Sequence, residues 1–143
     1  VAMGTDGQAC NNGQEMLDTF KWVLNMHKLN SGDATILSPE QVIRMACCNS
    51  AYAFGQPSEI GSLEPGKKAD VIIVDLGDPR MTMPSLSVPS LLVNFAKSSD
   101  VAMTIVDGKI LMQDKEILVV DEDQVLKEFR AARSALLIRA GVS

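Results

Sequence analysis

The sequence predicts an α/β chain that does not close into a complete domain by itself. In the 143 residues, apolar side chains recur at helical spacing before residue 57 and again after residue 121. Between these stretches the sequence is rich in turn residues and short β-like runs. The chain also opens with one strand-like segment, and a lone buried strand needs neighbours on both edges. The predicted parts are residues 1–57, 58–120 and 121–143.

The first part begins with Val1–Asp6, which is predicted to be a short buried strand that ends at a polar residue. A loop follows, and Asn12 with Glu15 has the spacing of a helix capping box. Gly32 is expected to end that helix. Its predicted apolar face consists of Met16, Phe20, Val23 and His27, with Leu17 and Leu24 beside them.

A second helix is predicted to start at Ser38. Pro39 suits the first turn, and Gln41 completes a capping box with Ser38. The predicted apolar face of this helix consists of Val42, Ile43 and Ala46. A short further helix is expected over Asn49–Phe54, ended by Gly55.

Residues 58–120 have the pattern of a small β unit. Ala69–Asp75 is expected to be a buried strand and Ser90–Ala96 a short helix, with an irregular connection between them. Asp107-Gly108 has the sequence of a two-residue hairpin turn, so it is predicted to join Val101–Val106 to Lys109–Met112. Glu116–Val120 is expected to add a further short strand.

The last part is predicted to be one long helix. Asp121 and Gln124 provide the capping signal, and Gly141 ends the pattern. Its apolar side is expected to consist of Val125, Leu126, Phe129, Ala132, Leu136 and Leu137.

Composition limits the functions that are open to the chain. The net charge is −5 and the sequence contains no basic run, which argues against nucleic-acid binding and against an anionic membrane partner. The apolar runs are too short to span a bilayer, and no secretory leader is visible. Three unevenly spaced cysteines do not form a disulfide framework, so a reducing compartment such as the cytoplasm is expected.

Two stretches of the sequence resemble the amidohydrolase superfamily. The first is Gly4-Thr5-Asp6-Gly7, followed by Asn11-Asn12. It looks like the eighth barrel strand and following loop of deaminases such as the 5′-methylthioadenosine/S-adenosylhomocysteine deaminases. The second runs from Ile60-Gly61-Ser62-Leu63-Glu64-Pro65-Gly66-Lys67-Lys68-Ala69-Asp70 into Val71-Ile72-Ile73-Val74-Asp75. It resembles the point where such enzymes leave the barrel and return to a small β-sandwich.

The resemblance implies an architecture. Such enzymes are (β/α)8 barrels about two to three times longer than this chain. Residues 1–57 would be the carboxy-terminal end of the barrel, 58–120 part of a composite β-sandwich, and 121–143 the carboxy-terminal helix. The missing amino-terminal barrel portion would then be a partner of this chain. Members are often homodimers, and apolar faces left uncovered here predict self-association or packing against another chain.

The resemblance also implies a site. A carboxylate at the Asp6 position ligates a divalent metal and accepts a proton from metal-bound water; zinc is the expected metal, with iron as the alternative. Asn11 would orient Asp6 or face the substrate, whereas Asn12 is expected to cap a helix. From the residues alone, Asp6 could equally be an ordinary turn aspartate. His27 is expected to be a core or helix-surface histidine, so this chain alone lacks the three or four ligands that zinc requires.

The activity that the resemblance implies is hydrolytic deamination of an adenosine derivative, a purine nucleoside or nucleobase substrate, by the complete enzyme. This chain alone is expected to be inactive. One alternative is another amidohydrolase, such as a guanine or cytosine deaminase or a triazine-type hydrolase. An alternative of a different class is a non-catalytic structural or interaction module. The module interpretation gains support if Asp6 points into solvent away from any cavity.

Overall fold

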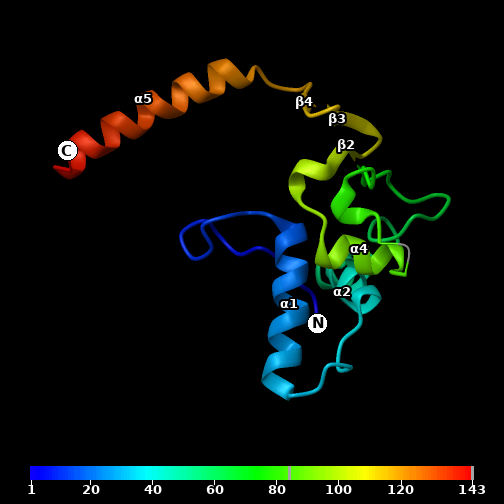
Figure 1. The fold of residues 1–143 in the computed structure, drawn as a ribbon. Helices are drawn as coiled ribbons and strands as arrows, with labels where there is room; N and C mark the ends of the chain where they lie inside the picture. Colours follow the sequence, from blue (N-terminus) through cyan, green and yellow to red (C-terminus); the bar gives the residue numbers. More distant parts are fainter. Residues whose placement is uncertain (84, 143) are drawn as a thin grey trace.

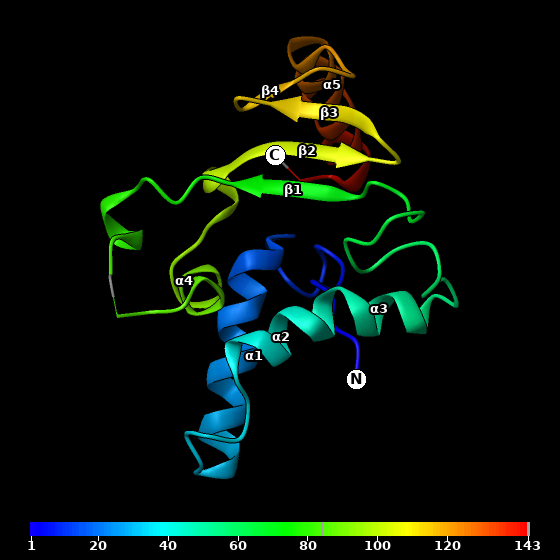
Figure 2. The ribbon, with the colours of Figure 1, turned by 90° about the vertical axis from the view of Figure 1, so that its right-hand side faces the viewer.

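The computed structural model describes residues 1–83 and 85–142. Helices pack below a small antiparallel sheet, and the last helix extends away from both (Figure 1, Figure 2). The helices are α1 (Met16–Ser31), α2 (Pro39–Ala46), α3 (Cys48–Ala53), α4 (Val88–Asn94) and α5 (Glu122–Ala140), with short 3-10 turns η1 (Pro79–Met81) and η2 (Ser98–Asp100). The strands are β1 (Val71–Val74), β2 (Val101–Val106), β3 (Lys109–Gln113) and β4 (Glu116–Ile117). The presence of these helices and strands confirms the predicted α/β class.

The prediction that Val1–Asp6 forms a buried strand is wrong. No described strand pairs with residues 1–6, and Val1 is 93% exposed. The segment is instead held by side chains of α3: Asn49 Nδ2 donates to the Val1 carbonyl at 2.7 Å, and Ser50 Oγ to the Met3 carbonyl at 3.4 Å. A strand is defined by its neighbours, and the described part of the chain supplies none for this segment.

Helix α1 starts later than the predicted Asn12 cap. Glu15 occupies the cap position, and its side chain makes no capping hydrogen bond. The predicted capping box is therefore wrong. The helix ends at Gly32, as expected, with a left-handed φ of 68°. Leu17, Phe20 and Leu24 form its buried face, which is the i, i+3, i+7 pattern of an amphipathic helix.

Helix α2 begins as the sequence predicts. Ser38 accepts from the Gln41 backbone N–H, and the Gln41 side chain accepts from the Ser38 N–H, which completes the capping box. Val42 is fully buried. The core joins α1, α2 and α4 and contains Leu17, Phe20, Leu24, Val42, Met81, Leu91, Val93 and Ala96.

The sheet has the order β1-β2-β3-β4, with every pair antiparallel. The predicted hairpin turn is confirmed, since Asp107 and Gly108 have φ values of 50° and 76° and join β2 to β3 as a primed turn does. β1 was expected to be buried, but it is an edge strand on which Ile72 is 50% and Ile73 48% exposed. Figure 2 shows β1 as the edge that faces the helices.

The long carboxy-terminal helix forms as predicted, but its apolar side is not covered. Asp121 accepts from the Gln124 N–H, and Gly141 ends α5 with a φ of 66°. No residue of α5 is buried, and Phe129 is 63% exposed. Figure 1 shows why: α5 leads away from the helical layer. Among the described residues, no helix is long and apolar enough to cross a membrane.

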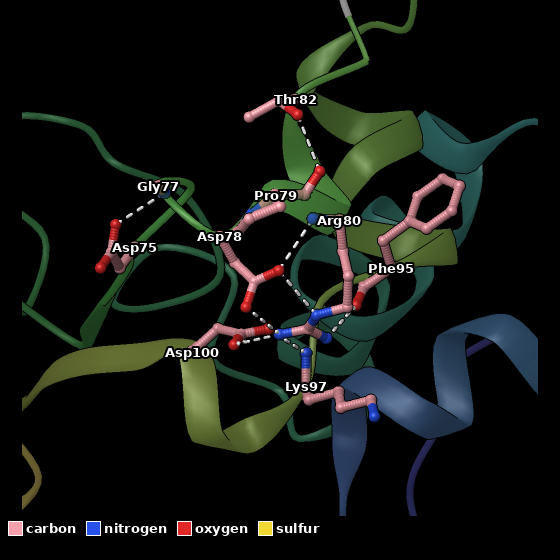
Figure 3. A network of polar contacts seen from close by, with 9 residues as sticks. All are labelled: Asp75, Gly77, Asp78, Pro79, Arg80, Thr82, Phe95, Lys97 and Asp100. Atoms are coloured by element: carbon pink, nitrogen blue, oxygen red, sulfur yellow. Dashed lines mark hydrogen bonds and ion pairs between the residues drawn. The ribbon is translucent and has the colours of Figure 1, made fainter.

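Arg80 ties the connection after β1 to the segment that leads into β2 (Figure 3). Its guanidinium donates to Asp78 at 2.9 and 3.1 Å, to Asp100 Oδ1 at 2.8 Å and to the Phe95 carbonyl at 3.2 Å. The second Asp100 oxygen accepts from the Lys97 N–H at 2.8 Å. Residues 95–100 are thereby fixed from several directions at once.

Candidate functional site

Asp6 lies at a tight turn with an unusual backbone conformation. Its φ is 61°, a left-handed value that aspartate tolerates better than most residues. Its Oδ1 accepts from the Gly7 N–H at 2.7 Å. The Gly7 carbonyl in turn accepts from the N–H groups of Cys10 and Asn11 at 3.0 and 2.9 Å. Such conformations are concentrated at functional sites, because they are kept only where surrounding structure enforces them.

Asn11 closes the loop that begins at Asp6. Its Nδ2 donates to the Thr5 carbonyl at 2.9 Å, so the side chain braces the residue immediately before the aspartate. The structure thus places the Asn11 side chain beside the Asp6 turn. Asn12 does not cap α1, since Glu15 holds that position.

The residues that the structure describes do not build a metal centre by themselves. Among them there is no group of three or more His, Cys, Asp or Glu side chains that could hold an ion. His27 lies on the exposed surface of α1, where its Nδ1 donates to the Val23 carbonyl at 2.9 Å. Asp6 fits the role of one oxygen ligand, and zinc requires three or four. Further ligands would have to come from outside this chain.

Two apolar cavities lie away from Asp6. One of about 520 Å³ separates the helices from β1 and has apolar walls that include Phe20, Ile43 and Ile72. A neighbouring cavity of about 430 Å³ shares Ile72 and Cys47 with it. Partial desolvation raises the pKa of the Cys47 thiol, which disfavours a reactive thiolate there. Neither cavity is lined by Asp6 or Asn11, and Asp6 is exposed.

A family match covers the segment that contains Asp6. The sequence model described as the amidohydrolase family matches residues 1–111, a span that includes the Asp6 turn, the helical layer and most of the sheet. The chain belongs to the amidohydrolase family.

Relatives of this amidohydrolase chain are much longer than it is. It is 46% identical over 140 residues to a 5′-deoxyadenosine deaminase of Methanosarcina acetivorans, an alignment that covers 98% of this chain and 32% of the relative. It is 39% identical over 137 residues to a 5-methylthioadenosine/S-adenosylhomocysteine deaminase of Syntrophomonas wolfei, covering 96% of this chain and 32% of that enzyme. The chain therefore spans about a third of the length of the curated relatives it matches.

A solved structure gives the same result in three dimensions. An adenosine deaminase from Xanthomonas campestris with bound zinc superposes with a TM-score of 0.89 at 31% identity, covering 94% of this chain and 30% of that enzyme. The fold described above is thus part of an amidohydrolase enzyme fold. The sequence had predicted this membership from the Asp6 turn and the motif that begins at Ile60.

One polar contact at the end of the loop that follows Asp6 had no clear sequence signal. Glu15 Oε1 accepts from the Ser98 N–H at 2.7 Å, across 83 positions of the sequence. The pattern around Glu15 indicated a local capping role instead. A contact between distant segments leaves no trace in local spacing, so only the structure could reveal it.

Proposed function

We propose that this amidohydrolase chain forms the carboxy-terminal part of a metal-dependent enzyme that hydrolytically deaminates an adenosine derivative. The candidate substrates are 5′-deoxyadenosine, methylthioadenosine and adenosylhomocysteine. The observation that carries the proposal is the 46% identity, across nearly the whole chain, to a protein named as a 5′-deoxyadenosine deaminase. A second relative, named for the other two substrates, is 39% identical.

The same proposal assigns the parts of the chain. Residues 1–57 would end the (β/α)8 barrel, with residues 1–6 as its last strand, and residues 58–120 would contribute to the β-sandwich. Residues 1–6 pair with no described strand, which is consistent with this assignment, because a barrel strand without its neighbours has both edges open. Asp6 lies at the carboxyl end of that segment, the end at which barrel enzymes place their active sites.

Asp6 would hold and move a proton in this enzyme. A divalent metal, zinc or iron, held mainly by ligands outside this chain, would make a bound water more acidic. The Gly7 N–H donates to Asp6 Oδ1 and would orient the carboxylate that receives the proton of that water. The same carboxyl would then deliver the proton to the departing amino group. Asn11 would maintain the turn by holding the Thr5 carbonyl, or would contact the substrate.

A chimera tests this proposal directly. The segment of the Methanosarcina acetivorans relative that aligns with this chain is replaced by residues of this chain, and ammonia release is measured from the three candidate substrates and from guanine. We expect deamination of an adenosine derivative. Asp6→Asn should lower the rate by about 100-fold or more, the usual contribution of a proton-transfer group.

Asp18→Asn is the matched control, since it makes the same chemical change at an exposed aspartate of α1 and should leave the rate unchanged. Circular dichroism shows whether each variant is folded, and elemental analysis shows whether it holds metal. A folded chimera in which Asp6→Asn retains the parent rate would refute the role of Asp6. Preference for guanine would favour a different amidohydrolase activity.

One observation favours a non-catalytic module instead. Asp6 is exposed and lines neither of the two apolar cavities. Asp6 would be equally exposed if the rest of its site lay outside this chain. The chain covers only 32% of the length of these relatives. The chimera separates the two explanations: a folded, metal-loaded chimera without activity, tested beside an active parent relative, supports the module.

A further inference from the structure

Glu15 connects the loop that carries Asp6 to the β unit. It is the last residue of that loop and the cap residue of α1. Carboxylates are favourable at helix N-termini, and a cap residue usually bonds the first turn of its own helix. Glu15 does not do so; its Oε1 accepts from the Ser98 N–H at 2.7 Å. A charged acceptor makes a stronger hydrogen bond than a neutral one.

The segment that receives Glu15 is itself held firmly. Ser98 begins η2, two residues before Asp100. The Asp100 side chain is only 9% exposed, and it binds both Arg80 and the Lys97 N–H. Figure 3 shows Asp100 bonded on one side to the Arg80 guanidinium and on the other to the Lys97 N–H. Glu15 therefore attaches the loop to a fixed point.

The other end of the loop is also fixed. Asn49 and Ser50 of α3 hold the carbonyls of Val1 and Met3, and Asn11 holds that of Thr5. Between the two ends the loop contains Gly7 and Gly13, where an added Cβ would meet nothing within 4 Å. The hydrogen bonds inside the loop lie around Gly7, so restraint at both ends lowers the conformational freedom of its remaining residues.

We propose that Glu15 is a positioning residue for Asp6, acting through its hydrogen bond to the Ser98 N–H. This inference rests on the proposed function, in which Asp6 handles the proton. The Asp6 turn, with its left-handed φ of 61°, is held from the β unit as well as from α3. Loss of the Glu15 bond would let the loop, and with it the Asp6 turn, sample other conformations.

Amide hydrogen exchange on this chain, followed by NMR, tests the structural step without requiring activity. The Ser98 amide reports the Glu15 bond, and the Gly7 amide reports the Asp6 turn. In Glu15→Ala we expect the Ser98 amide to exchange about tenfold faster, as the loss of one such bond predicts. The Gly7 amide, which lies eight positions away in sequence, should also exchange faster, by about threefold.

Two variants separate positioning from general destabilisation. Asp18→Ala removes a carboxylate from the first turn of α1, close to the Glu15 cap. Asp18 accepts from Trp22 within the helix, so this variant should change neither amide. Glu15→Gln keeps the Oε1 acceptor, so its Gly7 amide should stay within about twofold of the parent. If Ser98 exchanges faster in Glu15→Ala while Gly7 does not, or if Asp18→Ala has the same effect on both amides, the proposal is wrong.

The chimera adds a functional measurement. Glu15→Ala should lower kcat with little change in KM, and Glu15→Gln should restore most of the rate, because the hydrogen bond rather than the charge is needed. An inactive parent chimera would count against the proposed function, while the exchange data would still decide whether Glu15 holds the Asp6 turn. Equal kcat values for Glu15→Ala and the parent would overturn the positioning role.

Discussion

Gly61, in the motif that begins at Ile60, is expected to tolerate no side chain. A Cβ at this position would lie 2.6 Å from the Ala51 Cβ and 3.0 Å from the Cys47 carbonyl oxygen, and the residue has a φ of +92°. The left-handed backbone costs an L-residue about 1–2 kcal/mol. The crowding against α3 adds about 1–3 kcal/mol, as overpacking does elsewhere. Gly61→Ala should therefore destabilise the chain by roughly 2–5 kcal/mol.

Gly66 provides the matched control for this prediction. Its φ is +93°, almost the same, but a Cβ there would meet nothing within 4 Å. Gly66→Ala should cost only the backbone part, about 1–2 kcal/mol. Both substitutions reduce the conformational freedom of the unfolded chain equally. The difference between their effects on the free energy of unfolding therefore isolates the contact with α3.

Urea unfolding followed by circular dichroism measures these free energies. Ala51→Gly should partly rescue Gly61→Ala, because it removes the 2.6 Å contact, although a helical glycine costs about 1 kcal/mol itself. A double-mutant cycle gives the coupling between the two positions. If Gly61→Ala and Gly66→Ala cost the same, or if the cycle shows no coupling, the packing explanation is refuted.

Two further predictions concern charge and exposed apolar surface. The pKa of Asp78 lies below its usual value because the Arg80 side chain donates to its carboxylate. This contribution to stability is fully present above the unfolded-state pKa of about 3.9 and is lost as the pH falls through the lower folded-state pKa. The free energy of unfolding can be measured between about pH 5 and pH 2, the range around that pKa. It should fall less steeply with acidification in Arg80→Gln than in the parent. An unchanged slope would contradict this. The uncovered side of α5 predicts self-association, so sedimentation at tens of micromolar should show oligomers that Phe129→Lys reduces; a monodisperse parent would contradict it.

The elements that the sequence predicted well are those that depend on nearby residues. The Ser38 capping box formed because both partners lie within one helical turn. The Asp107-Gly108 turn formed because both residues adopt positive φ. The end of α1 at Gly32 depends on the same local property. Each of these features depends only on residues that are close together in the sequence, so it could be predicted without knowledge of the rest of the fold.

The elements that failed depend on distant parts of the molecule. Val1–Asp6 has the composition of a strand, but pairing requires a second strand, and the described residues offer none to it. Glu15 has capping-box spacing with Asn12, yet its carboxylate is taken by Ser98. Phe129 lies on a well-formed apolar side of α5 that nothing in the described chain covers.

The candidate site divides in the same way. The Asp6 turn and its support by Asn11 are local, and the motif around them was enough to single out both residues. A metal centre combines ligands from several strands, and a chain that covers a third of its relatives cannot reveal the rest. The role of Asp6 therefore stays a prediction until the chimera is assayed.

The edge position of β1 has a consequence for how copies of this chain can meet. Antiparallel pairing of Val71–Val74 with itself in a second copy, centred on the two isoleucines, would place Asp70 of each copy opposite Asp75 of the other. Carboxylates directly opposite across a strand pair repel, and charges at the ends of an apolar run act as gatekeepers against aggregation. Pairing of two copies through β1 is thus disfavoured by its flanking carboxylates.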